Sequence, residues 1–465
     1  MAIKFKYNTV VKYEVTAVCT QPLHIGSALG DKEEVLIHPV DEIPFIQATS
    51  LAGVFRSYYE KVQKEPKAVN LLFGGKEFGE NENSSEYGSK IRFSEGVFLK
   101  EEVKMELRPR VSIDGVSGTC AQSIVKGTSR ASGHKFNMEY IGAGAKFKFF
   151  IYLYDETKMA DVEEIFSAIH QETIAFGGQK SNGCGYIKLE KLYRKKFDMK
   201  QKKDRELWVN EEQMKCSDYE DILSSLQKTN VLQNAYDIVV EGETEGSLLV
   251  KGIVVGNYKK DTQTGKNNQN AKKDMQYNMN IQNAKKEYII PGSSFKGAIR
   301  SQMSKIADYL QQSEVIQNTF GYAGNENNQG KIGNITFYDT VVGEKEKNDK
   351  MPLSHRIHID KFTGGVMQRG LFSEKNIAGD MTFQIGIADK NEPEKTFGIL
   401  LMALRDLAIG TMSIGSGYNI GKGIIKVKKI TITDNKCQRE AVIDFSKNKI
   451  EDTQNLIADC MRTVI

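Results

Sequence analysis

The pattern of apolar and polar positions predicts two kinds of element along the chain. The stretches VKYEVTAVCT, from Val11, and FKFFIYLYD, from Phe147, are apolar at every second position or continuously, which is typical of strands. SLAGVFRSYYEKV, from Ser50, and DVEEIFSAIH, from Asp161, space their apolar residues as a helix does when it buries one face. This order of strands and helices predicts an antiparallel sheet covered by helices on one face.

The same order of elements occurs twice, because the chain contains an internal repeat. Residues 43–57, IPFIQATSLAGVFRS, recur 244 positions later as EYIIPGSSFKGAIRS. Three further pairs follow in the same order: LLFGG and NTFGY, VSIDGVSGTCAQ and IHIDKFTGGVMQ, and FGGQKSNGCGYIKL and IGSGYNIGKGIIKV. We therefore predict an α+β chain of two tandem ferredoxin-like (RRM-like) modules. The expected domains are residues 1–195, a charged linker at 196–236, and residues 237–465 with a C-terminal tail.

Composition narrows the class of protein without indicating a partner. The 465 residues suffice for two domains, and 64 Lys and Arg against 60 Asp and Glu leave a net charge of only +4, so any basic surface must be local. The six cysteines are scattered, with neither metal-binding spacing nor a disulfide framework. No run of about 18 apolar residues occurs, so we expect a soluble, cytoplasmic protein without a membrane partner.

The segment PGSSFKGAIRS in the second repeat has the pattern of an anion site at a helix start. Ser293 or Ser294 is expected to cap the helix, and Lys296 and Arg300 lie four positions apart on one face. Free amides at a helix N-terminus, followed by aligned cations, can bind a phosphate. The alternative is an ordinary capped helix with a solvated basic face.

The first repeat keeps only part of this pattern. Ser50 and Arg56 remain, whereas Ala52 replaces the lysine. We expect a weaker or different phosphate contact there.

Each repeat ends in a glycine-rich run, residues 177–185 and 415–423, that follows a helix and leads into a strand. Glycine can present bare backbone amides to a phosphate, and a nearby lysine adds charge. A dinucleotide-binding fingerprint needs the reverse order of strand and helix, so we exclude it. A tight turn without ligand contacts remains the alternative. The residues expected to contact phosphate are Gly178, Lys180, Gly421 and Lys422.

With these motifs, residues 10–190 and 237–430 resemble the RAMP superfamily (repeat-associated mysterious proteins), and more narrowly the backbone subunits of type III CRISPR effector complexes, with two subunits fused as in type III-D. The resemblance implies that a hairpin called the thumb, at residues 108–130 and 356–375, interrupts the pairing of guide and target RNA. An apolar wedge can unstack bases. The alternative is a plain hairpin whose aspartate caps a turn. The thumb cations expected to hold phosphates are Lys126, Arg130, Arg356 and Arg369.

Backbone subunits of that family often cleave target RNA with an aspartate in the loop after the first strand. Asp31 lies 13 residues before Pro44, and Asp274 lies 14 residues before Tyr288, the matching position of the second repeat. The resemblance therefore implies that both aspartates are catalytic and bind a divalent cation, Mg²⁺ or Mn²⁺, together with RNA. Exposed loop aspartates without a catalytic role are the alternative.

The expected function is that of a guide-RNA-binding backbone subunit that cleaves target RNA as a metal-dependent endoribonuclease. Its expected partners are the CRISPR guide RNA, a complementary target RNA and other effector subunits. A non-cleaving scaffold and a nuclease that processes repeat RNA are the alternatives within the superfamily. A generic RNA-binding protein with two RRM modules would need sheet aromatics in a KGFGFVxF-like motif, and the sequence has none.

Overall fold

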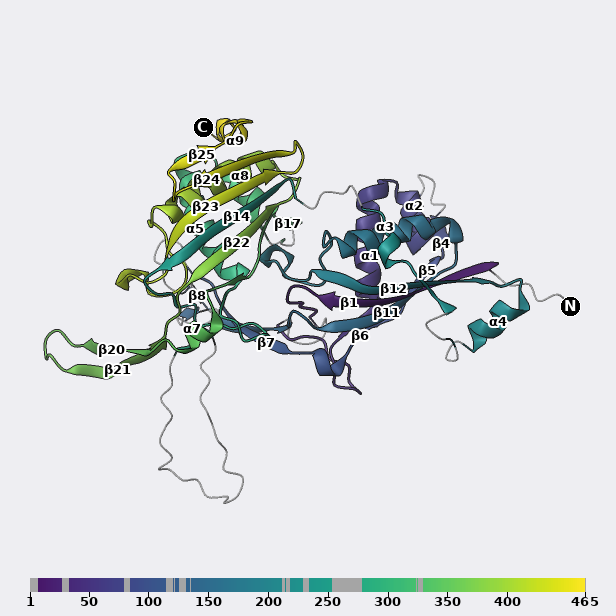
Figure 1. Ribbon diagram of the computed structural model, residues 1–465, viewed down its shortest axis with the longest axis horizontal. Coiled ribbons are helices and arrows are strands. Elements are labelled where there is room, and N and C mark those ends of the chain that lie inside the picture. The colour runs from purple at the N-terminus through teal and green to yellow at the C-terminus, as the bar shows by residue number, and fades with distance from the viewer. Residues whose placement is uncertain are drawn as a thin grey trace, which may run out of the picture. The chain divides into compact units, whose positions relative to one another are not determined.

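The chain folds into two compact units (Figure 1). Unit 1 comprises Met1–Glu106, Glu139–Lys180 and Cys184–Gln233, and unit 2 comprises Leu107–Met138, Ser181–Gly183 and Asn234–Ile465. Unit 2 thus includes two segments of the first repeat, and the domain boundaries expected from the sequence stay a prediction. The computed structural model describes residues 7–26, 33–78, 84–113, 120, 122–124, 131–133, 135–210, 214, 218–228, 234–252, 278–322, 324 and 329–464.

Unit 1 is built on an antiparallel sheet with the strand order β13-β12-β1-β11-β6-β2, and β5 pairs with β11. The strands are β1 (Thr9–Cys19), β2 (Phe45–Ile46), β5 (Ile91–Phe93), β6 (Gly96–Phe98), β11 (Lys146–Leu153), β12 (Ile187–Asp198) and β13 (Glu220–Asp221). Helices α1 (Ala48–Gln63), α2 (Pro66–Phe73) and α3 (Met159–His170) lie on one side of this sheet, and α4 (Lys202–Val209) lies on the other (Figure 1).

The core of unit 1 lies between the sheet and α1 and α3. The ring of Tyr13 in β1 lies 5.3 Å from that of Phe166 in α3, and its hydroxyl donates to Glu163 at 3.1 Å. Phe55 of α1 packs against the same Phe166 ring at 5.6 Å. Full burial of one such ring stabilises the fold by about 1.5–3 kcal/mol. Because successive residues of a strand point to opposite faces, Lys12 and the other even-numbered residues of β1 face away from these helices.

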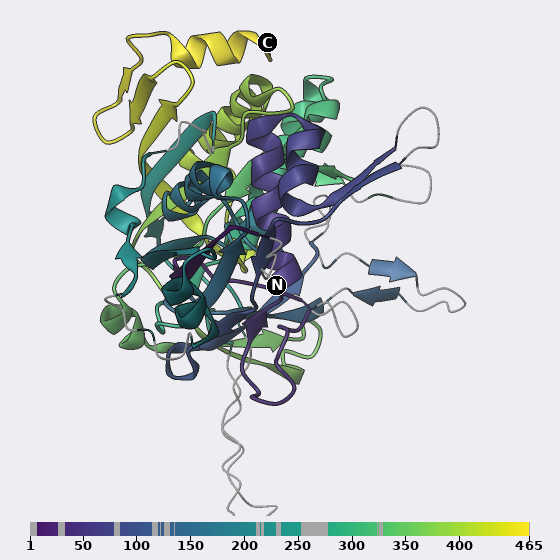
Figure 2. The same cartoon turned by 90° about the vertical axis from the view of Figure 1, so that its right-hand side faces the viewer.

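Unit 2 repeats this plan with the strand order β18-β22-β14-β23-β24-β25. Phe295 of α5 packs at 4.1 Å from Phe383 of β22, and at 5.4 Å from Phe337 of β18. Helix α9 follows the β24–β25 hairpin near the C-terminus (Figure 2). The strands are β14 (Tyr236–Glu245), β18 (Ile335–Phe337), β22 (Asp380–Ile387), β23 (Ile424–Asp434), β24 (Arg439–Asp444) and β25 (Lys449–Glu451). The helices are α5 (Gly292–Tyr309), α6 (Glu314–Phe320), α7 (Lys345–Asp349), α8 (Pro393–Ala408) and α9 (Leu456–Arg462).

Short two-stranded ribbons and turns complete the chain. The ribbons are β3 (Gly75–Phe78) with β4 (Ser84–Tyr87), β7 (Met105–Val111) with β10 (Lys135–Ile141), β8 (Gln122–Ile124) with β9 (Ala131–Gly133), β15 (Ile289–Ile290) with β19 (Thr340–Val341), β16 (Gly321–Tyr322) with β17 (Lys331–Ile332), and β20 (Leu353–Ile359) with β21 (Val366–Lys375). The 3-10 turns are η1 (Lys100–Glu102), η2 (Glu156–Lys158), η3 (Lys180–Asn182), η6 (Leu223–Ser225) and η7 (Tyr418–Ile420). Within the described ranges, no helix has the length and apolar character needed to cross a membrane.

The two sheets carry the same irregularity at the same place. The register of β1 against β12 shifts between Thr16 and Ala17, and that of β14 against β23 shifts between Glu241 and Gly242. The order of strands and helices also repeats from one unit to the other. The prediction of two tandem α+β modules is confirmed.

Candidate nucleic-acid interface

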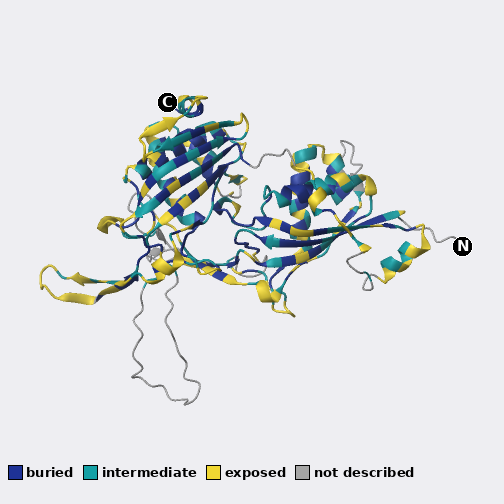
Figure 3. Cartoon of the chain, viewed as in Figure 1, coloured by how far each residue is buried: buried dark blue, intermediate teal, exposed yellow. Residues whose placement is uncertain are grey.

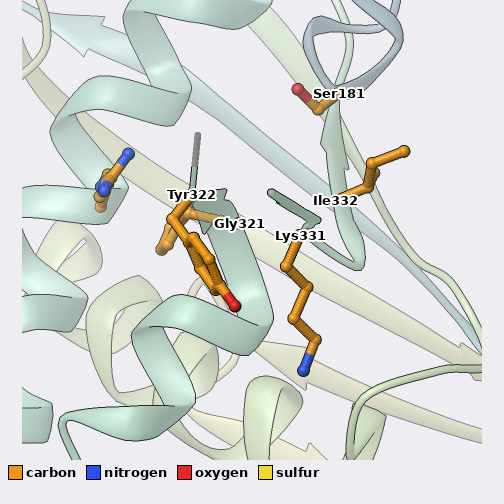
Figure 4. Close-up of a pocket in the computed structure, with 8 residues that line it drawn as sticks. Ser181, Gly321, Tyr322, Lys331 and Ile332 are labelled. Carbon is orange, nitrogen blue, oxygen red and sulfur yellow. The ribbon is translucent and has the colours of Figure 1, made fainter. Parts of the chain in front are cut away.

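An open cavity of about 510 Å³ in unit 2 lies beside Arg300, the second cation of the PGSSFKGAIRS segment. Tyr322 of β16 and Lys331 of β17 stand opposite each other in one ribbon at its wall, and Ser181 adds a hydroxyl group (Figure 4). The lining residues are Ser181, Arg300, Phe320, Gly321, Tyr322, Lys331, Ile332 and Gly333. None of these lining residues is acidic, so the cavity is electropositive.

Among the described residues, no carboxylate pairs with the cations of this cavity. The guanidinium of Arg300 lies 5.4 Å from the centre of the Phe320 ring, a cation–π contact. Lys331 donates from Nζ to Asn318 Oδ1 at 2.7 Å. Lys296, one turn before Arg300 on α5, donates to Ser181 Oγ at 2.7 Å. A phosphate would therefore meet several donors whose charge no described carboxylate compensates.

Lys296 has a low pKa for a lysine, because its ammonium is partly buried and lies near other cations. Desolvation, and then repulsion from Arg300 and Arg110, lower the pKa of Lys296 to about 8. An anion bound at the cavity would favour the charged form and raise this pKa again. Lys296 is thus the group whose protonation reports on an anionic ligand.

The prediction that Ser293 or Ser294 caps α5 is wrong. Pro291 occupies the N-cap position, and no side chain of the cap residue bonds to the helix. Instead, the Gly292 N–H donates to Asp339 Oδ1 at 2.9 Å, and the other carboxylate oxygen of Asp339 pairs with Arg108 at 2.7 Å. A protein carboxylate therefore satisfies an amide that was expected to face phosphate. Ser293 and Ser294 lie half-buried in the first turn.

The matching helix of unit 1 uses its arginine for internal contacts. Arg56 pairs through Nε with Glu60 at 2.9 Å, and donates to Gly74 O at 2.9 Å and Asn70 Oδ1 at 3.0 Å. Ser50 is half-buried in α1. A hollow of about 290 Å³ beside Arg56 is lined by the carboxylates of Glu60 and Glu65, unlike the cavity of unit 2. RNA contact by Arg56 stays a prediction, which these internal contacts disfavour.

The glycine-rich loop of unit 1 bonds to the protein itself. Gly178 donates its amide to His24 O at 2.8 Å. A Cβ at Gly177 would approach the same carbonyl to 2.2 Å, and its φ of +67° also requires glycine. Lys180 stays exposed, although partial desolvation lowers its pKa. Of the two residues predicted here, only Lys180 has a side-chain donor, and no bond from it to another described residue is seen.

The loop of unit 2 is closed in the same way. Gly421 is exposed, but its amide donates to Tyr418 O at 2.9 Å. Lys422 is buried, and its ammonium donates to Glu374 Oε2 and Asn376 Oδ1, both at 2.7 Å. These bonds match the tight-turn alternative, because no free ammonium or amide is left at either residue. Their RNA contacts stay a prediction.

The thumb of the second repeat is the β20–β21 hairpin. Arg356 pairs with Glu374 at 2.5 Å. Burial alone would raise the pKa of Glu374, but its bonds with Lys422 and Arg356 outweigh burial and lower that pKa. At the tip, Asp360 accepts from the amides of Thr363 at 2.9 Å and Phe362 at 2.8 Å, and these bonds lower its pKa. The aspartate thus caps the turn.

One face of the hairpin is an exposed apolar stripe. Ile357 stands opposite Leu371, and Ile359 stands opposite Val366, with exposed fractions of 52%, 52%, 52% and 59% respectively. Phe362 at the tip is 86% exposed, and the whole hairpin is coloured as exposed over most of its length (Figure 3). This surface has the character of the predicted apolar wedge.

Several predicted residues lie outside the described part of the chain. Arg369 belongs to β21, but its side chain is not described. The residues outside the described ranges are Asp31, Lys126, Arg130 and Asp274. Among the described residues, no group of three or more His, Cys, Asp or Glu could hold a metal ion. The catalytic and metal roles therefore stay predictions.

Sequence reasoning missed the aromatic and basic residues that complete the cavity. Phe320 and Tyr322 belong to NTFGY, which was recognised as a repeat landmark and not as a binding element. Lys331 follows a polar stretch without a motif, and only its pairing opposite Tyr322 brings it to the site. No local pattern could have indicated Lys331.

The comparison with protein families agrees with the duplicated architecture. The model of the RAMP superfamily matches residues 16–188 and 253–426, one region in each repeat. Among solved structures, the chain is similar to a chain in the cryo-EM structure of the type III-B Cmr-beta complex bound to cognate target RNA, at 17% identity and a TM-score of 0.28. That similarity covers 40% of this chain and 61% of the other. No curated protein matches. The two matched regions together span well over half of the sequence, and the chain belongs to the RAMP superfamily, whose domain it carries twice.

Proposed function

We propose that this protein is a guide-RNA-binding backbone subunit of a type III CRISPR ribonucleoprotein, with two backbone modules in one chain. The tandem RAMP domains support this assignment. The observation that carries it is the cavity of unit 2, where Arg300 and Lys331 meet aromatic rings without an acidic lining residue. Basic residues beside an exposed ring, here that of Tyr322, suit a single RNA strand, because phosphates meet the cations while a base stacks on the ring.

The cavity would hold the guide through its backbone. Arg300 is oriented by Phe320 and can donate two parallel bonds to one phosphate. Lys331 supplies a second charge, and Tyr322, whose exposed fraction is 45%, offers a ring face to a base. These contacts would position the strand without reading its sequence.

The hairpin at residues 353–375 would act as the thumb. Its apolar stripe, with Ile357 and Leu371 at its centre, can enter a base step and interrupt the pairing of guide and target. Insertion would also cover the exposed ring of Phe362.

Target cleavage is a finer part of the proposal. Asp31 and Asp274 would act on target RNA held against the guide, with a divalent cation as the cofactor. In the assembled complex with Mg²⁺ or Mn²⁺, each Asp→Ala change should remove one discrete cut while target binding persists. An unchanged cutting pattern in the double variant would reduce the chain to a scaffold subunit. The same complex should leave unprocessed repeat RNA intact, in contrast to a repeat-RNA processing nuclease.

Guide binding is tested with the purified full chain and an in vitro transcribed guide RNA. Arg300→Ala with Lys331→Ala should weaken binding about tenfold or more and reduce the slope of the salt dependence by about 0.7 for each phosphate that the variant no longer neutralises. The charge-matched control is Lys305→Ala with Lys350→Ala, two exposed lysines outside the cavity. Equal effects of the two double variants would contradict a role for the cavity.

A further inference from the structure

The sheet of unit 1 has a face that the sequence motifs did not reveal. Residues that pair across strands share a face, and Tyr13 fixes the opposite face as the helix side. The strand registers therefore place twelve side chains in four rows on the face away from α1 and α3. Read across β11, β1 and β12, the rows are Tyr152–Lys12–Lys195, Phe150–Glu14–Tyr193, Lys148–Thr16–Lys191 and Lys146–Val18–Lys188.

One end of this face is already covered. Trp208 of α4 packs at 5.5 Å from Tyr152. Lys12 donates to the hydroxyl of Tyr219 at 3.2 Å, and its ammonium lies 4.4 Å from the centre of the Phe150 ring. Burial accordingly lowers the pKa of Lys12. The segment after β12 thus closes the first row and leaves the last two rows accessible.

The accessible rows concentrate positive charge. Lys148, Lys188 and Lys191 are exposed, and none of them makes an ion pair with a described residue. Lys146 pairs with Glu190 at 2.8 Å. Like charges on neighbouring strands repel one another, so an anionic ligand would stabilise this arrangement.

The sheet of unit 2 provides a comparison at matched positions. When the two sheets are aligned at their register shifts, so that Glu241 matches Thr16, the rows of unit 2 are Gly386–Asp237–Thr433, Gln384–Val239–Thr431, Thr382–Glu241–Lys429 and Asp380–Glu243–Lys426. At these paired positions, four acids and two lysines stand where unit 1 has one acid and six lysines, and the three aromatic positions have no aromatic counterpart. The extra residue at each register shift reduces the contrast without removing it, because Glu190 pairs with Lys146 in unit 1, and Lys428 pairs with Glu243 and Asp380 in unit 2. The fold therefore accepts a basic or an acidic residue set on this face of the sheet, so the positive charge of the face in unit 1 is not required by the fold.

We propose that the lysine face of unit 1 (Lys146, Lys148, Lys188 and Lys191, bordered by Tyr193) binds a single-stranded polynucleotide at a site distinct from the cavity of unit 2. Phosphates would contact the lysines, and the half-exposed ring of Tyr193 would stack on a base. The aromatic ring favours a nucleic acid over an acidic protein, because charge alone would suit either partner. The site adds a second RNA contact to the proposed function and does not depend on the cavity.

The test uses the purified full chain and a labelled oligouridine of about 15 nucleotides, the size of one single-strand site. Lys188→Glu with Lys191→Glu should weaken binding at least tenfold at about 50 mM salt and lower the salt slope by more than one unit. The control, Lys426→Glu with Lys429→Glu, makes the same charge change at the matched positions of unit 2 and should alter affinity less than threefold. Thermal unfolding verifies that both variants fold. Equal losses in the two variants would overturn the proposal, since they would reflect net charge alone.

Two further measurements separate this site from the alternatives. Crosslinking of 4-thiouridine RNA should label the peptide that contains Tyr193. Labelling confined to the cavity of unit 2 would contradict RNA binding by the lysine face but would leave the proposed function intact. If Arg300→Ala with Lys331→Ala has no effect on RNA binding but the lysine-face variant loses binding, the result contradicts RNA binding at the cavity and supports RNA binding at the lysine face. Polyglutamate is compared with RNA in the same assay. If it binds as tightly as RNA, and Lys188→Glu with Lys191→Glu weakens both equally, the partner is an acidic protein and the nucleic-acid proposal is wrong.

Discussion

The ammonium of Lys296 donates a hydrogen bond of 2.7 Å to the hydroxyl of Ser181, one helical turn before Arg300. This bond fixes a partly desolvated lysine beside an arginine, with no acidic residue in the cavity lining. With a pKa of about 8, Lys296 loses its charge just above neutral pH, and an anionic ligand would shift this loss to higher pH.

RNA affinity should therefore fall as the pH rises from about 7 to about 9. With a pKa of about 8, Lys296 is charged in roughly a tenth of the molecules at about pH 9, so a contact that requires the charge weakens up to about tenfold. Binding at constant ionic strength measures this fall. Lys296→Arg should remove it, because arginine stays charged, and an unchanged pH profile in that variant would show that another group titrates.

The free energy of unfolding should instead rise with pH, through a window that overlaps the range in which affinity falls. The folded-state pKa of Lys296 lies below the ordinary lysine value, so the unfolded chain binds more protons between about pH 8 and about pH 10.4. Stability of the RNA-free protein should rise through this window in the wild type, compared with Lys296→Met. Opposite pH trends for stability and affinity would be hard to obtain from a general loss of structure.

The Asp339 carboxylate should contribute to stability more than a surface carboxylate does. Asp339→Ala removes the acceptor of Gly292 N–H and breaks the buried ion pair with Arg108, which should cost about 3–5 kcal/mol in urea unfolding. The control is Asp380→Ala, whose side chain is 81% exposed and pairs with Lys428 at 2.8 Å, and which should cost less than about 1 kcal/mol. Similar losses in both variants would mean that the buried pair is not a special feature of α5.

The sequence predicted the repeat, the α+β plan and the segment that carries Lys296 and Arg300, because these features depend on local periodicity and composition. It failed where partners come from distant parts of the chain. Lys422 looked like a free cation in a glycine-rich loop, yet its partner Glu374 lies 48 residues earlier. Tyr193 matched no RNA-binding motif, because the lysine face is assembled by register across three strands.

Lys422 should behave as a structural residue. Lys422→Met removes the lysine from Glu374, which keeps its ion pair with Arg356, and from Asn376 Oδ1, so we expect a loss of about 1.5–3 kcal/mol in stability, the cost of a hydrogen bond to a charged group. RNA affinity of the folded protein should change less than twofold. The pKa of Glu374 is lowered in the fold, so the difference from wild type should shrink as the pH falls below about 4 and the carboxylate is protonated. A loss of RNA affinity at unchanged stability would instead restore Lys422 as a phosphate contact.

Two glycines of the same loop should differ strongly in their tolerance of alanine. Gly421 and Gly423 have φ values of +74° and +78°, so the backbone strain of an alanine, about 1–2 kcal/mol, is nearly the same at both. A Cβ at Gly423 would approach Ile414 O to 2.1 Å, whereas a Cβ at Gly421 meets nothing within 4 Å. Gly423→Ala should therefore lower the urea midpoint far more than Gly421→Ala. Because Gly423 accepts the Ile414 N–H at 2.9 Å and closes the loop, equal midpoints would show that this turn is not required for the fold of unit 2.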